Sequence, residues 1–199
     1  VEAESGPIGG SASHEFMVNC ASGEDTILRC KASGYAANVE KCEIGDRGAW
    51  TLDAAPSGEL TEVHTPNLPG IEEVGKFMKV KPERMLKTIV FKVITKETAT
   101  APSWVVAVVR GDHDVNEGKV KTLAGGPVEM APEAEARAAG FAIGYVSPRV
   151  VNTVKNVTLL IDQDVAQGGF WASGADKKDY HVKHFNWARE VGPVLKDPS

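Results

Sequence analysis

The stretch TIVFKVITKETATAPSWVVAVVR, residues 88–110, decides the fold class of this chain. It holds two runs, 88–94 and 103–110, that are rich in β-branched residues and nearly continuous in apolar content, as is typical of central strands covered on both faces. The connection over 95–102 is too short for a helical crossover, so some strand pairs must be antiparallel. Because helical and extended patterns interleave along the rest of the chain, we expect an α+β domain on a mixed β-sheet.

Helices are predicted on both sides of these strands in the sequence. Apolar residues recur at helical spacing over 71–80, which predicts an amphipathic helix that begins near Gly70. A second, short helix (PERMLK) is expected from Pro82, because proline is acceptable in the first turn. Two further helices are expected over 116–123 and 132–139, with Asp112 or Asn116 capping the first and Gly140 ending the second. The remaining predicted strands cover 142–147, 157–162, 170–173 and 180–187, and residues 44–62 are expected to be a linker or surface connection.

Composition limits the class of protein. With 199 residues, 42% hydrophobic and 25% charged, the chain can bury one substantial core, so one main domain with flanking segments is expected. No run approaches the roughly 18 apolar residues of a membrane span, and the start carries no cationic leader, so a soluble, cytoplasmic protein without membrane contact is expected. A net charge of −5 argues against a general nucleic-acid binder.

Positive charge is nevertheless concentrated in one segment of the sequence. Between Lys76 and Lys92 stand six cations and one carboxylate, a local balance of +5. Two interpretations remain open here: a solvated helix surface, or a local contact for phosphate.

Cysteine and motif patterns exclude several chemistries. Cys20, Cys30 and Cys42 fit neither a disulfide framework nor a paired zinc motif, so reduced thiols are expected. The stretch from Cys30 to Ser33 is one substitution short of C-x-x-C, which leaves a degenerate metal knuckle open beside a structural thiol. The sequence has no phosphate-binding P-loop and no H-E-x-x-H motif, and no signature of a cysteine hydrolase surrounds a thiol. Metal-dependent hydrolysis is therefore not expected.

Five separated segments carry a resemblance. They are TPN at 65–67, LKT at 86–88, RGDH at 110–113, GYVSP at 144–148, and IDQDVA followed by GADKKDYH over 161–181. In this order and spacing they resemble the insertion (editing) domain of bacterial-type prolyl-tRNA synthetases, of the YbaK/ProRS-associated family, which hydrolyses alanine wrongly attached to proline tRNA. The resemblance implies a mixed, curved central sheet flanked by helices.

The two ends of the chain resemble another part of such synthetases. GPIGGSASHEF at 6–16 and GYAANVEK at 34–41 are similar to the catalytic domain before the insertion, and NWARE at 186–190 and KDPS at 196–199 to the return into it. The expected organisation is a catalytic-domain segment over 1–45, the editing domain over 46–185 and a return segment over 186–199.

The resemblance implies three catalytic positions. Lys87 lies between a basic helix and a buried strand, where its ammonium would project from the rim of the sheet, and the family's lysine holds the end of the tRNA acceptor strand. Asp162 follows a buried strand and matches an active-site carboxylate that orients water or the α-amino group. Gly144 opens the 144–148 loop, whose backbone lines the aminoacyl pocket and can place N–H groups near a developing oxyanion.

Other matched positions imply substrate binding. His181 helps to set the pocket size, so that alanine fits and proline does not, and Thr65 lines the same pocket. On the residues alone a second interpretation stays open for each: a surface lysine for Lys87, a turn or helix-capping aspartate for Asp162, and structural roles for His181 and Thr65. The substrate-binding set is Thr65, Tyr145, Val146, Ser147, Pro148 and His181.

The activity that the resemblance implies is hydrolysis of the ester in Ala-tRNA(Pro), with water as nucleophile and with positioning of the reactants as the main source of rate. The partners would be the 3′ acceptor end of that tRNA and the rest of a synthetase, which is a homodimer in this family. No metal or cofactor is expected for this segment, because ATP and Mg²⁺ belong to the full synthetase.

Two alternatives remain open: an insertion that docks the acceptor stem without chemistry, and a trans-acting deacylase for Cys-tRNA(Pro). The chain also departs from relatives at Gln163-Asp164, where an Arg-Ser or Arg-Thr pair is common, and at Asp176, where asparagine is common.

Overall fold

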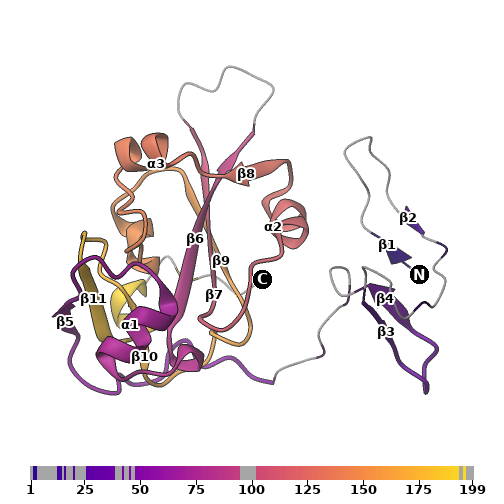
Figure 1. Cartoon of the computed structure of the whole chain (residues 1–199), viewed down its shortest axis with the longest axis horizontal. Helices are drawn as coiled ribbons and strands as arrows, with labels where there is room; N and C mark the ends of the chain where they lie inside the picture. The colour runs from indigo at the N-terminus through magenta and orange to yellow at the C-terminus, as the bar shows by residue number, and fades with distance from the viewer. Residues whose placement is uncertain are drawn as a thin grey trace. The chain divides into compact units, whose positions relative to one another are not determined.

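The computed structural model describes residues 2–3, 13–14, 16, 20, 26–38, 42, 45, 48–94, 102–192 and 195. The chain divides into two compact units, residues 1–46 and 47–199, which we describe separately (Figure 1). Among the described residues, no helix is both long and apolar enough to cross a membrane. The assignment of the first unit to a synthetase catalytic domain stays a prediction.

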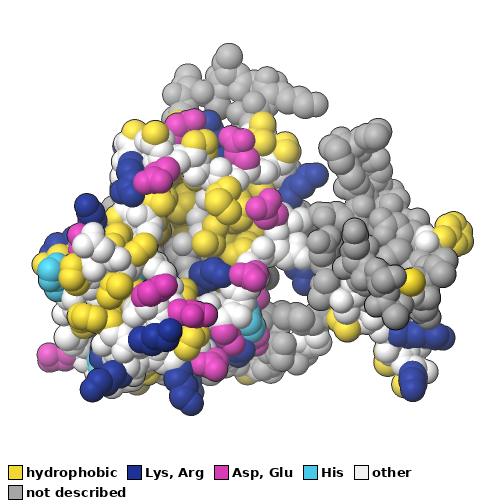
Figure 2. Space-filling model, in the orientation of Figure 1, with side chains coloured by type: hydrophobic (Ala, Val, Ile, Leu, Met, Phe, Trp, Pro, Cys, Tyr) yellow, Lys and Arg dark blue, Asp and Glu magenta, His cyan; other side chains and the backbone are white. Residues whose placement is uncertain are grey.

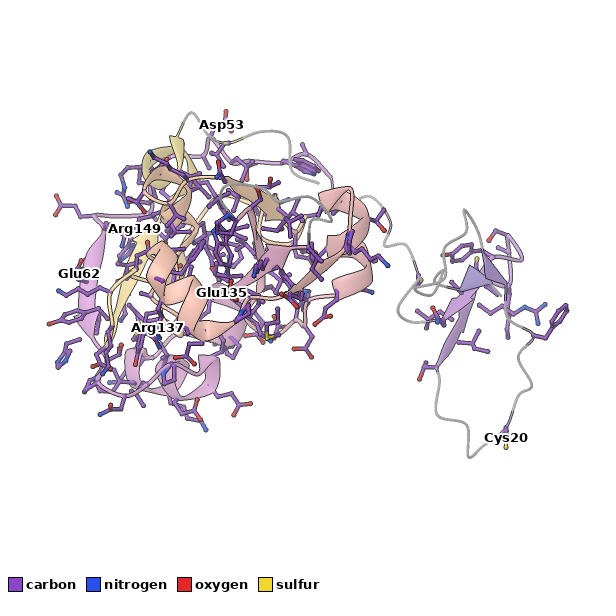
Figure 3. All side chains as sticks on the ribbon, turned by 90° about the horizontal axis from the view of Figure 1, so that it is seen from above. Cys20, Asp53, Glu62, Glu135, Arg137 and Arg149 are labelled. Carbon is purple, nitrogen blue, oxygen red and sulfur yellow. The ribbon has the colours of Figure 1, made fainter. Side chains whose placement is uncertain are left out.

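The first unit contains a small four-stranded sheet in the order β2-β1-β4-β3. Strands β3 and β4 form an antiparallel hairpin, and β1 pairs with β4 in parallel. In this unit Cys20 and Cys30 are exposed and none of the three cysteines forms a disulfide; Figure 3 labels Cys20. The strands are β1 (Glu2–Ala3), β2 (Ser13–His14), β3 (Ile27–Arg29) and β4 (Ala36–Asn38).

The second unit is built on a twisted four-stranded sheet in the order β8-β6-β7-β9. The central pair β6 (Leu86–Val93) and β7 (Trp104–Arg110) is antiparallel, as the short connection predicted. Strand β9 (Val157–Ile161) pairs with β7 in parallel, and the short β8 (Val128–Met130) pairs with β6 antiparallel. The predicted mixed sheet within an α+β fold is therefore confirmed.

A second, three-stranded sheet lies beside the first, in the order β10-β11-β5. Its strands are antiparallel, and a bridge from Met85 to Ala172 joins the two sheets at the start of β6. This arrangement brings the start of β6 next to β10, with a cavity between the two sheets. The strands are β5 (Thr61–His64), β10 (Trp171–Gly174) and β11 (Tyr180–Phe185).

The helices lie close to their predicted positions. Asn116 caps α2 by accepting a hydrogen bond from the Lys119 N–H at 3.0 Å, so of the two capping candidates it is Asn116 that caps. Gly140 ends α3 in the left-handed conformation, with a φ of 106°. The helical elements are α1 (Ile71–Met78), the 3₁₀ turn η1 (Pro82–Arg84), α2 (Glu117–Ala124), α3 (Glu133–Ala139), the 3₁₀ helix η2 (Pro148–Asn152) and α4 (Trp187–Glu190).

Each face of the four-stranded sheet is covered by apolar side chains. Because successive side chains of a strand alternate between faces, Leu86 and Val90 of β6 pack into the main core with α3 and the second sheet, whereas Phe91 packs toward α2. Trp187 and Val191, from the predicted return segment, are buried in the main core. The main core therefore joins the four-stranded sheet, the three-stranded sheet and the C-terminal helix.

Three sequence-based predictions differ from the structure. Residues 142–147 form a turn and a loop rather than a strand, because the Tyr145 N–H bonds to the Ala142 carbonyl and the Ser147 N–H to a carboxylate. The helix expected over PERMLK is only the turn η1, since Leu86 already belongs to β6. Residues 48–62, expected as a linker, pack on the main core through Trp50, Leu52 and Leu60, and β5 begins at Thr61.

Candidate functional site

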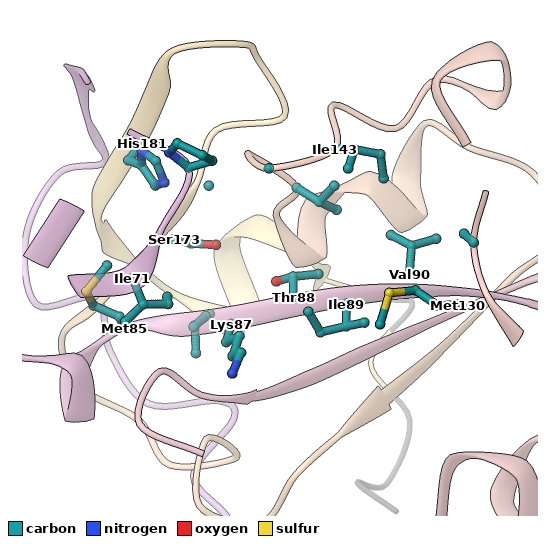
Figure 4. A pocket seen from close by; sticks show the side chains of 16 residues that line it. Ile71, Met85, Lys87, Thr88, Ile89, Val90, Met130, Ile143, Ser173 and His181 are labelled. Carbon is teal, nitrogen blue, oxygen red and sulfur yellow. The ribbon is translucent and has the colours of Figure 1, made fainter. Parts of the chain in front are cut away.

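A cavity of about 270 Å³ lies between the two sheets of the second unit. The first half of β6 forms one wall, the adjoining ends of β10 and β11 form a second, and the loop at 143–146 forms a third (Figure 4). Val90, Met130 and Ile143 line one end of the cavity, while Ser173, Thr88 and His181 lie toward the other. The polar side chains of the cavity thus lie toward one end, called the polar end below, where Ile71 and Met85 also line it, and the other end is apolar.

The apolar end opens to the surface. Met130 is 62% exposed, and hydrophobic side chains gather on this face between α3 and α1, surrounded by charged ones (Figure 2). At this edge Lys92 of β6 donates to Glu135 of α3 at 2.6 Å; Figure 3 labels Glu135. A ligand can therefore reach the cavity across an apolar rim with charged groups around it.

The predicted 144–148 loop borders the cavity through Gly144 and Val146. Gly144 has a φ of 91°, a conformation that favours glycine, and it turns the chain after α3. Ser147 is fully buried, and its hydroxyl caps η2 by accepting a hydrogen bond from the Arg149 N–H at 3.3 Å. Pro148 is the first residue of η2 and fixes the exit of the loop.

Asp176 holds this loop from behind. Its carboxylate accepts a hydrogen bond from the Ser147 N–H at 2.6 Å, and its own N–H donates to the Tyr145 carbonyl at 2.9 Å. Arg149 Nε lies 3.4 Å from the second carboxylate oxygen, and the Arg149 guanidinium also donates to the Ala175 carbonyl. Burial raises the pKa of Asp176 to about 6, against the opposing effects of the Ser147 N–H and Arg149.

Gly174 lets the end of β10 approach the loop closely. A Cβ atom at this position would stand 2.2 Å from the Tyr145 carbonyl oxygen and 2.5 Å from that of Val146. Both contacts are with backbone, which cannot move aside as a flexible side chain could. Only glycine fits here, so the loop lies directly on the strand.

Thr65 and His181 form a buried pair at the polar end. The Thr65 Oγ1 and His181 Nδ1 atoms lie 2.7 Å apart and share a hydrogen bond, and the Tyr145 ring stands edge-on to the imidazole. The residues are 0% and 6% exposed. Burial lowers the pKa of His181 to about 4, so the imidazole is neutral at physiological pH.

Asp179 connects this pair to the loop. Its carboxylate accepts hydrogen bonds from the Tyr145 hydroxyl at 2.8 Å and the Asn67 N–H at 2.9 Å. Its carbonyl accepts from the Thr65 N–H at 2.8 Å. The structure therefore brings the predicted residues Thr65, Tyr145 and His181 together through a residue that the sequence did not single out.

Lys87 borders the cavity, but its ammonium points to the opposite side of β6 from Thr88 (Figure 4). There it donates to the His113 carbonyl at 3.0 Å and to the Asp114 carboxylate at 2.7 Å. The lysine side chain is 28% exposed and that of Asp114 is 99% exposed. Such an exposed ion pair is weak and open to exchange with another anion.

Asp162 does not line the cavity. It follows β9 at the edge where the parallel strand β7 also ends, and its carboxylate accepts a hydrogen bond from the Asp164 N–H at 2.9 Å. Its carbonyl accepts from the N–H groups of Val165 and Ala166, so the residue fixes a turn. Ligand atoms of His113, Asp162 and Asp164 lie within 4.8 Å of one another. Its predicted catalytic role and the absence of a metal stay predictions.

The sequence missed several residues of this site. Gly174, Asp176 and Asp179 all lie in the quoted stretch GADKKDYH, and Asp176 had been noted only as a departure from relatives. Ser173 carried no signal, because a serine at the end of a strand is ordinary. The dense run of glycine and carboxylates before His181 could have suggested a tight turn that serves the site.

Comparisons with known proteins agree on the family. A family model for the aminoacyl-tRNA editing domain matches residues 65–190, well over half of the chain. A proline-tRNA ligase of Dehalococcoides mccartyi strain 195 is 39% identical over 96% of this chain, and that of strain BAV1 is 38% identical. The chain spans only 31% of the length of these relatives.

Solved structures share the fold. One is a protein proposed to be a trans-editing enzyme for prolyl tRNA synthetase; 70% of this chain superposes on 83% of it, with a TM-score of 0.54 and 20% identity. Another, a hypothetical protein, gives a TM-score of 0.55 at 22% identity, covering 69% of this chain and 85% of the other. All residues that line the cavity, from Pro69 to His181, lie inside the matched range of 65–190. The chain therefore belongs to the aminoacyl-tRNA editing domain family.

Proposed function

We propose that this chain is the editing part of a proline-tRNA ligase and hydrolyses the ester that joins alanine to the terminal adenosine of proline tRNA, with water as nucleophile. The observation that carries the proposal is the cavity itself, a space of about 270 Å³ between the 143–146 loop and the neutral Thr65–His181 pair. Its volume lies just below the range of about 300–1,000 Å³ that is usual for drug-sized ligands, which suits an aminoacyl group with part of a ribose.

Size discrimination would come from the rigid polar end. His181 is held by Thr65 and packed against Tyr145, and Gly174 lies directly on the loop, so these walls cannot retreat to admit a larger group. Exclusion of a side chain that is too large is the stronger form of steric selection. Alanine would therefore enter and proline would not.

The loop would polarise the ester carbonyl. In the described part of the chain, the N–H groups of Gly144 and Val146 donate no backbone hydrogen bond, whereas those of Tyr145 and Ser147 are used. Both residues line the cavity. Backbone donors fixed in advance stabilise the oxyanion of a tetrahedral intermediate without reorganisation.

Rate would depend on positioning. The buried His181 is a weak base because its pKa is low, and the carboxylates nearest to the loop, Asp176 and Asp179, are occupied by hydrogen bonds. We therefore assign the orientation of the attacking water to a hydroxyl of the substrate's ribose. Asp162 would contribute by fixing the 162–166 turn, outside the cavity.

Lys87 would anchor the acceptor strand. Its ammonium lies on the side of β6 opposite to Thr88 and is held there by the fully exposed Asp114 carboxylate, which a phosphate of the tRNA can replace at little cost. The terminal adenosine would then lie over the exposed apolar end near Met130, with the aminoacyl group directed inward.

The test is release of labelled alanine from Ala-tRNA(Pro), with Pro-tRNA(Pro) and Cys-tRNA(Pro) as comparison substrates. Lys87→Ala should raise the KM for tRNA about tenfold or more, in line with the loss of one charged contact of about 1.5–3 kcal/mol. Lys155→Ala is the control, because Lys155 is an exposed lysine that precedes β9 and does not line the cavity.

Each alternative predicts another outcome of this experiment. Binding of tRNA in a gel shift without release of any amino acid would favour a docking insertion. Preferential release of cysteine would favour the trans-acting alternative, and equal release of alanine and proline would contradict the proposed pocket.

A further inference from the structure

Two hydroxyl groups in the cavity have no hydrogen-bond partner among the described residues: Thr88 Oγ1 and Ser173 Oγ. Ser173 is 1% exposed, and the Thr88 oxygen is inaccessible although its residue is partly exposed. Nearly all buried polar groups in folded proteins are paired, because a buried hydroxyl without a partner loses its hydrogen bonds to water and gains none in return. Two such groups in one cavity therefore point to a ligand.

The two hydroxyls face the same space. Thr88 lies on the side of β6 that faces the main core, with Leu86 and Val90, while Ser173 lies near the end of β10 in the second sheet. In Figure 4 their oxygen atoms are directed toward one another across the polar end of the cavity, below His181. A single small polar group placed there can contact both.

The surroundings of this space select the kind of group. No carboxylate lines the cavity within the described residues, and the only lysine there, Lys87, directs its ammonium to the other side of the strand. The imidazole of His181 is neutral. A site lined by uncharged groups that both donate and accept suits an amine, whose α-amino pKa of about 7.7–8.0 lets it lose its charge at small cost.

We infer that the hydroxyls of Thr88 and Ser173 bind the α-amino group of the aminoacyl ester and so make these two side chains specificity-determining residues. The inference rests on the proposed function and deepens it. An ester without a free primary amine would leave both hydroxyls unsatisfied, and the ring of proline would carry carbon into the space where the hydroxyls meet. Recognition of the amine thus adds a polar criterion to the steric one.

The experiment compares two substrates and three variants in the full chain. Ala-tRNA(Pro) and propionyl-tRNA(Pro), which differ only in the α-amino group, are prepared by the same chemical acylation. Single-turnover hydrolysis is measured for each and corrected for its spontaneous rate. The variants are Thr88→Val and Ser173→Ala, which remove one hydroxyl each, and Thr88→Ser, which keeps it.

We expect the original chain to hydrolyse the alanyl ester at least about tenfold faster than the propionyl ester, as expected for a hydrogen bond of about 1.4 kcal/mol. Thr88→Val and Ser173→Ala should each slow alanyl hydrolysis about tenfold and leave propionyl hydrolysis unchanged, since one partner is already absent. Thr88→Ser, which keeps the hydroxyl, should again hydrolyse the alanyl ester about tenfold faster than the propionyl ester. Thr158→Val, on the exposed side of β9, is the control and should change neither rate.

A purely structural role, or a contact with the ester carbonyl, would slow both substrates by the same factor, and that result would overturn the inference. Unchanged rates in both variants would overturn it as well. These outcomes differ from failure of the proposed function, in which the original chain releases no alanine at all. Thr88→Val preserves the shape of the side chain, so the test does not depend on Ser173→Ala folding.

Discussion

Asp176 is a mostly buried, ionisable residue that also holds the loop of the site in place. Its carboxylate holds the Ser147 N–H and faces Arg149, yet burial keeps its pKa near 6. The folded protein therefore holds this proton more tightly than the unfolded chain, whose aspartates titrate near 3.9. The stability that the neutral carboxyl contributes is fully present below about pH 4 and is lost as the pH rises through 6.

Asp176→Asn should remove this pH dependence, because asparagine keeps the acceptor for the Ser147 N–H and cannot ionise. The difference in the free energy of unfolding between the variant and the original chain should therefore grow in favour of the variant as the pH rises from 4 to 7, by up to about 3 kcal/mol. Urea denaturation at four pH values in this window measures the difference. A difference that stays constant with pH would show that Asp176 titrates normally.

At the residue scale, the predicted roles of the site residues stay predictions, and the structure shows where these residues lie. Gly144, Val146 and His181 line the cavity, while Thr65 reaches it only through its hydrogen bond to His181. The Lys87 ammonium lies on the side of the sheet opposite to the cavity, where it is bound by the loop after β7. Asp162 lies at the edge of the sheet, in the turn after β9. Alternation along β6 could have separated Lys87 from Thr88, but the contacts of a loop cannot be read from spacing.

At the scale of elements, the position of the loop at 143–146 depends on its close contact with Gly174 of β10. The sequence predicted both central strands from their nearly continuous apolar, β-branched content, and α1 from its helical periodicity. It made a strand of 142–147, since AIGYVS has strand composition, but Gly144 and the Asp176 carboxylate bend this segment into a loop. The short strands β5 and β8 carried too few residues for an alternating pattern.

Gly174→Ala should therefore displace the loop, because the added Cβ meets two backbone carbonyl oxygens at 2.2 and 2.5 Å. We expect a loss of at least about tenfold in kcat/KM for deacylation together with a loss of stability of about 1–3 kcal/mol from overpacking. Gly126→Ala is the control, since a Cβ there meets nothing within 4 Å. Full activity in Gly174→Ala would contradict the close contact between loop and strand.

At the scale of the molecule, the C-terminal helix belongs to the core that supports the site. Trp187 is 1% exposed, and its Nε1–H donates to the Val165 carbonyl at 2.7 Å, which ties α4 to the turn that follows β9. The sequence indicated an α+β fold with a mixed sheet. It did not indicate that the strands form two sheets, because strand pairing and the bridge from Met85 to Ala172 that joins the sheets are contacts between segments far apart in the sequence.

Trp187→Ala should cost about 3–5 kcal/mol in the free energy of unfolding, the range for a large buried aromatic. Trp187→Phe should cost less, because it keeps most of the apolar volume and loses mainly the hydrogen bond to Val165. Chemical denaturation of the second unit within the intact chain measures both. Equal stability of the alanine variant and the original chain would show that α4 is not part of this core.

The central claim is that the cavity between the two sheets receives the aminoacyl group. A crystal structure with a non-hydrolysable alanyl-amide analogue of the terminal adenosine tests it most directly. The account predicts the alanyl amine between Thr88 and Ser173, its carbonyl at the loop N–H groups, and the adenosine over the apolar rim at Met130. Density for the analogue at the His113–Asp162–Asp164 edge, with the cavity unchanged, would contradict the account.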